Sequence, residues 1–234
     1  MSYIGTNKLG TMYLGDTKIA KAYLGDDLVY SSEVAPAPAE PTYIQTAGAA
    51  YLDTGVAHAG RNIEITLVAQ WTGSTASQFE SFLAYMKNGD TKPRCGIHKY
   101  NGKWMFGTNS TNSTSVNVDG NKHKFFLTSN ASTNKEQLYI DDTFVMEGTT
   151  TSDGLVGNTI TFFLGCRNIN GSIDNPCYAK FYSLSIKKYI DGAHTGLLSE
   201  FNFVPKKVNG VYGMYETVGG NFYPSIGTAQ FTGD

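Results

Sequence analysis

The chain has 234 residues, of which 41% are hydrophobic and 16% are charged, and its net charge is −2. The hydrophobic fraction excludes disorder along the whole chain, because enough apolar surface is present to form a core. The near-zero charge and scattered basic residues exclude a general attraction to nucleic acid or to an anionic membrane surface, since both need a concentrated basic surface.

The composition predicts strands and turns, with 26 glycines and 13% aromatic residues. No apolar run approaches the roughly 20 residues of a membrane helix. The N-terminus lacks a basic region followed by an apolar stretch, so we expect synthesis in a cytoplasm. Cys95, Cys166 and Cys177 have no metal-binding spacing, and we expect buried, reduced thiols.

A repeat opens the chain as YIGTNK, YLGDTK and YLGDD, ten residues apart each time. Each three-residue connector begins with Gly and contains Asn or Asp, which suits tight hairpins. We therefore predict an antiparallel β-meander of about four short strands over residues 1–32. Both faces are partly apolar and the sheet is too small to be stable alone. We expect it to serve attachment and oligomerisation through the apolar residues of the repeat: Tyr3, Tyr13, Leu14, Tyr23 and Leu24.

A proline-rich stretch follows over residues 33–41, and its small and charged neighbours favour an extended polyproline spacer. A spacer holds two modules apart, which favours binding of the repeat to another copy or to another protein. The alternative is that the repeat packs on the larger domain as an ordinary extra sheet.

Residues 42–234 show strand patterns throughout and no sustained helical period. Apolar residues alternate over 63–67, residues 138–147 predict a hairpin turning at Asp141 and Asp142, and 159–165 and 179–190 predict further strands. So many strands imply two stacked antiparallel sheets, in a sandwich or jelly roll.

Five stretches of this segment together resemble a known family. They are YIQTAGAAYLDTGV (43–56), LYIDDTFV (138–145), FFLGCRNINGS (162–172), AKFYSLSIKKY (179–189) and FVPKKVNGVYGMYETVGGNFYPSIGTAQFTG (203–233). Their order is similar to that of a concanavalin A-like, laminin-G-type domain, in the version attached to structural proteins of tailed bacteriophages and to prophage or gut-bacterial surface proteins. The resemblance covers residues 43–233.

The repeat also resembles short N-terminal modules of phage structural proteins. Together the two resemblances imply a non-enzymatic phage virion protein, a head or tail fibre or decoration protein. It would be displayed on the virion surface, made in the bacterial host cytoplasm and anchored to capsid or tail by the repeat. A homotrimer is the expected assembly, and host surface glycans are the expected ligands. The alternative is a bacterial carbohydrate-binding surface lectin.

A glycan site needs an aromatic platform flanked by amide, carboxylate or guanidinium groups. Residues 94–115 contain both within one predicted hairpin and its loop, and a second candidate follows the strand at 162–165. The candidate glycan-binding residues are Arg94, Tyr100, Trp104, Asn109, Asn112, Arg167 and Asn168. The alternative places Trp104 in the core and makes the Asn/Ser/Thr run a solvated loop.

Catalysis is not expected. Glucanases of the wider fold carry a Glu-x-Asp-x-x-Glu strand, and the nearest acidic residues here lack that spacing: Glu136, Asp141, Asp142 and Glu147. A glucanase-type hydrolase is therefore the least favoured alternative.

No cofactor is expected either. The four histidines, at 58, 98, 123 and 194, show no metal spacing. Laminin-G-type domains often bind calcium through loop oxygens, which makes Asp53, Asp153 and Asp174 calcium candidates, with ordinary turn carboxylates as the alternative.

Overall fold

A computed structural model describes residues 39–57, 62–74, 78–87, 94–108, 112–150 and 158–234 in full, together with the backbone of six short strands between residues 3 and 31. The chain divides into two compact units, Met1–Ala39 and Glu40–Asp234. Each unit is described by itself below. No helix long and apolar enough to cross a membrane occurs in the part of the chain that the structure describes.

The first unit contains three β-hairpins at the three repeats. Their closing pairs are Ile4↔Asn7, Leu14↔Thr17 and Leu24↔Asp27. The hairpins therefore fall at the predicted places, but the third residue of each predicted connector, Asn7, Thr17 or Asp27, belongs to the following strand. The described pairings stay within each hairpin, whereas we expected one continuous meander. The side chains of the five predicted attachment residues and the spacer 33–38 lie outside the described part, so attachment stays a prediction. The strands are β1 (Tyr3–Ile4), β2 (Asn7–Lys8), β3 (Tyr13–Leu14), β4 (Thr17–Lys18), β5 (Lys21–Leu24) and β6 (Asp27–Ser31).

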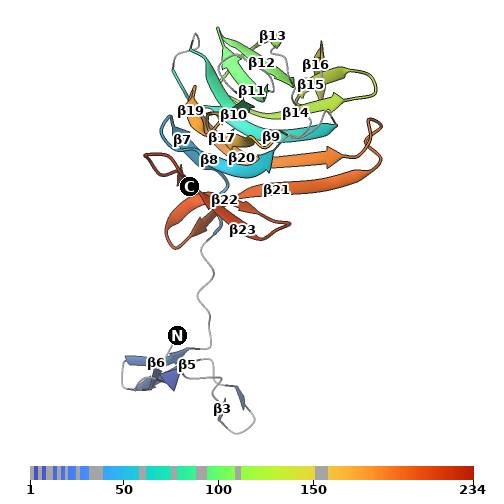
Figure 1. Cartoon of the computed structure of the whole chain (residues 1–234). Helices are drawn as coiled ribbons and strands as arrows, with labels where there is room; N and C mark the ends of the chain where they lie inside the picture. Colours follow the sequence, from blue (N-terminus) through green and yellow to red (C-terminus); the bar gives the residue numbers. More distant parts are fainter. Residues whose placement is uncertain are drawn as a thin grey trace. The chain divides into compact units, whose positions relative to one another are not determined.

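The second unit is the predicted all-β sandwich, and its larger layer is a ten-stranded sheet (Figure 1). The order is β16-β15-β14-β9-β20-β21-β22-β23, with β7 also beside β20 and β24 beside β7. The strands are β7 (Ile44–Ala47), β9 (Ile63–Trp71), β14 (Lys122–Asn130), β15 (Lys135–Ile140), β16 (Thr143–Thr149), β20 (Tyr178–Tyr189), β21 (Leu197–Val208), β22 (Val211–Glu216), β23 (Asn221–Pro224) and β24 (Thr232–Gly233).

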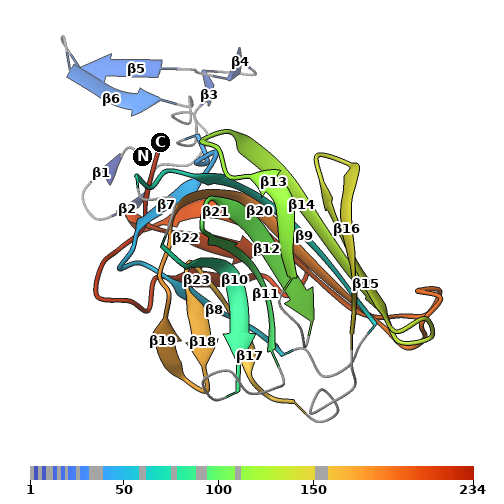
Figure 2. The same cartoon turned by 90° about the horizontal axis from the view of Figure 1, so that it is seen from above.

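The smaller layer is an eight-stranded sheet that covers one face of the larger one (Figure 2). Its order is β13-β12-β11-β10-β17-β8, and β18 also pairs with β10 and with β19. The pairing of β18 with β10 is parallel, unlike the other pairings described. The strands are β8 (Leu52–Ala57), β10 (Glu80–Met86), β11 (Arg94–Tyr100), β12 (Lys103–Thr108), β13 (Asn112–Asn117), β17 (Thr161–Leu164), β18 (Arg167–Ile169) and β19 (Ser172–Asp174).

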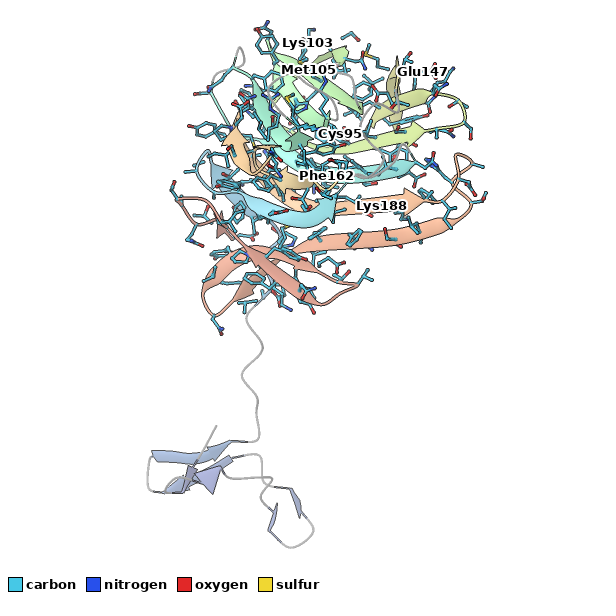
Figure 3. All side chains as sticks on the ribbon, in the orientation of Figure 1. Cys95, Lys103, Met105, Glu147, Phe162 and Lys188 are labelled. Atoms are coloured by element: carbon cyan, nitrogen blue, oxygen red, sulfur yellow. The ribbon has the colours of Figure 1, made fainter. Side chains whose placement is uncertain are left out.

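The hydrophobic core lies between the two sheets. Strand β9 alternates buried and half-buried residues, as its sequence predicts, because successive side chains of a strand point to opposite faces. Cys95 and Phe162 lie among the core side chains (Figure 3). All three cysteines are free and buried, which confirms the prediction of reduced thiols.

Two tight turns in the second unit are confirmed. Asn101 and Gly102 join β11 to β12 with φ of 49° and 71°, and Asp141 and Asp142 join β15 to β16 with φ of 50° and 63°. Two successive residues with positive φ match the twist of antiparallel strands, and Asn, Asp and Gly tolerate that conformation best.

Candidate functional site

The candidate site is a patch of aromatic and arginine side chains on the outer face of the eight-stranded sheet. Alternation along β11 separates its residues: Cys95 and Ile97 join the core, so Arg94, His98 and Tyr100 point outward. We call the set Phe79, Arg94, His98, Tyr100 and Arg167 the arginine patch.

Three aromatic rings form the floor of the arginine patch. Phe79 lies 5.1 Å from His98 and 5.6 Å from Tyr100, between ring centroids. Tyr100 is 42% exposed and offers its ring to solvent. A Cβ atom on Gly96 would lie 2.4 Å from Nε2 of His98, so the imidazole fits across the strand only because residue 96 is glycine.

Arg167 reaches the patch because the chain reverses at Gly165, whose φ is +96°. After the reversal, β18 runs parallel to β10 and pairs Arg167 with Ala84, on the face that carries His98. The guanidinium lies 5.6 Å from the centre of the Phe79 ring and forms an ion pair with Asp174. The Arg167 guanidinium group is thus held against an aromatic ring, where its N–H groups can donate to carboxylate or hydroxyl groups.

His98 is a neutral member of the patch. Burial, together with the charges of Arg167 and Arg94, lowers its pKa to about 3. Its Nδ1 lies 2.9 Å from the Ser81 hydroxyl oxygen, which fixes the ring orientation. The imidazole therefore serves as uncharged aromatic surface beside two cations.

Two of the seven predicted glycan residues, Tyr100 and Arg167, contact the same Phe79 ring, and a third, Arg94, lies on the same face at the other end of β11. The prediction of Trp104 as a platform is wrong: it is 1% exposed, on the core side of β12. Its ring packs 4.7 Å from that of Phe125, because alternation turns it away from Tyr100. The alternative that placed Trp104 in the core is the one confirmed.

The predicted asparagines do not join the patch. Asn112 donates from Nδ2 to Oε1 of the buried Glu136 at 2.8 Å. Asn168 is 3% exposed; it donates to the Thr161 carbonyl oxygen at 2.9 Å and accepts from the Gly171 amide at 2.7 Å, which are structural roles. Both predictions as open glycan ligands are therefore wrong. Asn109 lies outside the described residues.

Two members of the patch, Phe79 and His98, were not predicted. His98 could have been found, because it lies two residues before Tyr100 and four after Arg94 on one strand. Phe79 precedes β10 and has no periodic signal, so only the tertiary contacts with His98, Tyr100 and Arg167 reveal it.

The four acidic residues considered for a glucanase do not face one cleft. Glu136 is buried on the core side of β15, and Asp141 and Asp142 form the turn that follows. Glu147 is on the outer side, where it pairs with Lys135 at 2.7 Å. This arrangement lacks the facing carboxylate pair that glycoside hydrolysis requires.

The calcium candidates also have other partners. Asp53 accepts a hydrogen bond from the Gly55 amide at 2.8 Å, and Asp174 pairs with Arg167, while Asp153 lies outside the described residues. Within the described ranges, no three His, Cys, Asp or Glu side chains are grouped as a metal would need. Calcium binding stays an untested prediction.

Comparison with known proteins identifies the fold. No family model and no curated protein sequence matches the chain. The CBM40 domain of the Ruminococcus gnavus IT-sialidase, solved with alpha2,3 sialyllactose bound, superposes with a TM-score of 0.51 at 11% identity, covering 63% of this chain and 90% of its own. A Bacteroides ovatus protein provisionally described as carbohydrate-binding gives 0.55 at 11% identity, covering 83% of this chain and 60% of its own. The fold of the second unit is thus a concanavalin A-like jelly roll.

Proposed function

We propose that the sandwich is a non-enzymatic glycan-binding domain and that the arginine patch is its binding surface. The observation that carries this is the Phe79 ring, which lies 5.6 Å from the exposed Tyr100 ring and 5.6 Å from the Arg167 guanidinium group. Arg94 lies farther along the same face of β11, beyond His98. Sugar rings stack on aromatic faces, and guanidinium groups donate hydrogen bonds to sugar hydroxyls or, in pairs, to sugar carboxylates. The sialyllactose bound to the R. gnavus domain supports glycans as the ligand class.

The test is a glycan array containing neutral and acidic bacterial and animal glycans, followed by calorimetry on any ligand found. We expect Tyr100→Ala and Arg167→Gln each to weaken binding at least about tenfold, since buried aromatic and arginine contacts dominate recognition. Val218→Ala is the control, because that side chain is 66% exposed and distant in sequence from the patch.

Two outcomes would refute the proposal: an array without signal, or binding that both patch variants retain. A thermal melt of each variant separates loss of the ligand contact from loss of the fold. Hydrolysis of β-glucans by the purified chain would contradict the non-enzymatic part of the proposal.

For the biological setting, we propose a phage virion protein on the virion surface, made in the host cytoplasm. The repeat would attach it to capsid or tail while assembling a homotrimer, and the sandwich would be displayed to host glycans. The support is the resemblance of both segments to phage structural modules and the three hairpins at the repeats. Deleting residues 1–32 should abolish both the trimer mass in solution and incorporation into particles. A truncated chain that keeps both would disprove attachment by the repeat.

A second candidate is a bacterial carbohydrate-binding surface lectin. It is favoured by the structural likeness to domains from two bacteria, R. gnavus and B. ovatus. Both candidates share the glycan-binding step and differ in the role of the repeat. Capsid or tail genes beside the coding gene would favour the virion protein, and their absence would favour the lectin.

A further inference from the structure

A groove of about 420 Å³ lies on the outer face of the ten-stranded sheet, on the opposite side of the sandwich from the arginine patch. Its size falls within the roughly 300–1,000 Å³ typical of small-molecule sites. Its lining includes Glu64, Lys135, Gln137, Glu147 and His194. They come from β9, β15, β16 and the loop between β20 and β21, and we call this the polar groove.

One wall of the polar groove is the loop between β20 and β21, which packs against the turn between β14 and β15. Figures 1 and 2 both show the loop between β20 and β21 beside the turn between β14 and β15. Asn130 donates from its side-chain amide to the Gly192 carbonyl oxygen. A Cβ atom on Gly192 would lie 2.0 Å from Oγ of Ser132, so the loop approaches this closely only because residue 192 is glycine. The wall is therefore formed before any ligand arrives.

His194 is fixed in this wall. Its ring stacks on Tyr189 with centroids 4.4 Å apart and planes 5° apart. Nδ1 lies 3.1 Å from Oε1 of Glu64 and Nε2 lies 3.1 Å from the Ser129 carbonyl oxygen. Tyr189 donates its hydroxyl to the other Glu64 oxygen at 2.7 Å. The aromatic pair and the carboxylate thus form one rigid unit.

The opposite wall is a chain of paired donors and acceptors. Glu147 accepts from Lys135 at 2.7 Å and from Gln137 at 3.0 Å, and Gln137 accepts from the Tyr139 hydroxyl at 3.2 Å. The two contacts of Glu147 cross from β16 to β15, and the Tyr139–Gln137 contact lies along β15, so the groups keep a fixed spacing. Carboxylate oxygens can accept from more than one donor, which leaves capacity for ligand hydroxyls.

We propose that the polar groove is a second binding site, for a neutral, hydroxyl-rich saccharide of one or two rings. The groove offers carboxylate acceptors and ammonium and amide donors at fixed spacing, and a sugar hydroxyl both donates and accepts. Lys135 already faces Glu147 and His194 already faces Glu64, so an acidic sugar would meet a carboxylate beside each of these donors. The inference does not depend on the arginine patch, because the two surfaces belong to different sheets.

The probes are four neutral disaccharides, lactose, cellobiose, maltose and diacetylchitobiose, titrated into the full chain labelled for amide NMR. We expect at least one to shift amide signals of residues 135–137 and 192–194 selectively. Gln137→Ala should weaken that binding at least tenfold, and His194→Phe, which keeps an aromatic ring against Tyr189, should weaken it less. Tyr100→Ala and the exposed Val204→Ala should leave it unchanged.

Three results would overturn the inference: no groove shifts with any of the four disaccharides, undiminished binding by Gln137→Ala, or stronger groove shifts with sialyllactose than with lactose. Failure here leaves the proposed function standing if Tyr100→Ala still abolishes array binding. If the arginine-patch variants bind glycans as the unchanged chain does and the disaccharides still shift the groove amides, the glycan site lies on the ten-stranded sheet.

Discussion

His98 and His123 lie in oppositely charged surroundings, although both belong to strands of one sandwich. His98 is buried on the outer face of the eight-stranded sheet, and this burial, together with the charges of two arginines, holds it neutral. His123 lies at the rim of the core with Asp141 2.7 Å from Nδ1 and Asp119 2.7 Å from Nε2. The His98 imidazole is uncharged. The His123 imidazole is placed to carry a positive charge between the carboxylates of two turns.

The pKa of His123 shows which force prevails at that site. Burial alone would lower it, but the hydrogen bonds to Asp141 and then Asp119, with their charges, outweigh burial and raise it. Asp141 also accepts from the Lys124 amide at 2.9 Å, so the imidazolium ties the turn before β14 to the turn after β15. The comparison teaches that the charge of a buried histidine depends on whether its charged neighbours reinforce the effect of burial, as at His98, or oppose it, as at His123.

The largest expected effect comes from Trp104→Ala. This substitution removes a ring that packs against His123 and leaves the surroundings of His98 intact. The indole lies 6.2 Å from His123 and on the opposite face of the sheet from His98. We expect a loss of about 3–5 kcal/mol in the free energy of unfolding, because a large buried ring leaves a cavity. Urea denaturation measures it, and the half-buried Lys103→Ala is the matched control on the same strand, with a loss below about 1 kcal/mol. Equal losses in the two variants would contradict the core placement.

The next effect tests the neutral histidine through pH. The folded pKa of His98 is about 3, below its unfolded value near 6.5, so stability falls as pH drops below about 6.5. Between pH 7.5 and 5 this group should cost about 2 kcal/mol, since only the unfolded chain takes up the proton. His98→Gln should remove that pH-dependent loss. Any destabilisation that the substitution itself causes should be the same at both pH values. Urea midpoints at both pH values test this, and an unchanged pH dependence would refute it.

The smallest effect has the opposite sign and comes from His123→Gln. The folded pKa of His123 is raised, so its stabilisation is complete below about pH 6.5 and is lost as pH rises through the folded pKa. We expect the variant to be about 1 kcal/mol less stable at pH 5, a modest value because Asp119 and Asp141 are 47% and 53% exposed. The deficit should shrink at pH 9. A deficit that grows with pH would reverse our assignment of the charged form.

Much of the fold follows from local patterns. Alternation in 63–67 predicts β9, and the Asp141–Asp142 pair predicts the hairpin of β15 and β16 at the right residues. These signals are local because side-chain direction and turn geometry depend on adjacent residues. The same alternation in 103–106, read as Lys-Trp-Met-Phe, would have placed Trp104 in the core. The polar run that follows it favours the opposite placement, and the two local signals conflict there.

The candidate site was less predictable because it depends on distant pairing. Arg167 meets Phe79 only through the parallel register of β18 with β10, and nothing local specifies a parallel neighbour in an otherwise antiparallel sheet. The polar groove depends in the same way on the close fit of Gly192 to Ser132, 60 residues apart. Such contacts are tertiary, so sequence spacing alone does not contain them.

The parallel β18 strand has a consequence for folding. It pairs Arg167 with Ala84, which lies about 80 positions earlier in the chain. Contacts of such long sequence separation form slowly, because loop closure must come first. A ligand that needs both Arg94 and Arg167 would therefore bind only chains in which the sandwich has closed, and its capture would report the fraction of correctly folded protein.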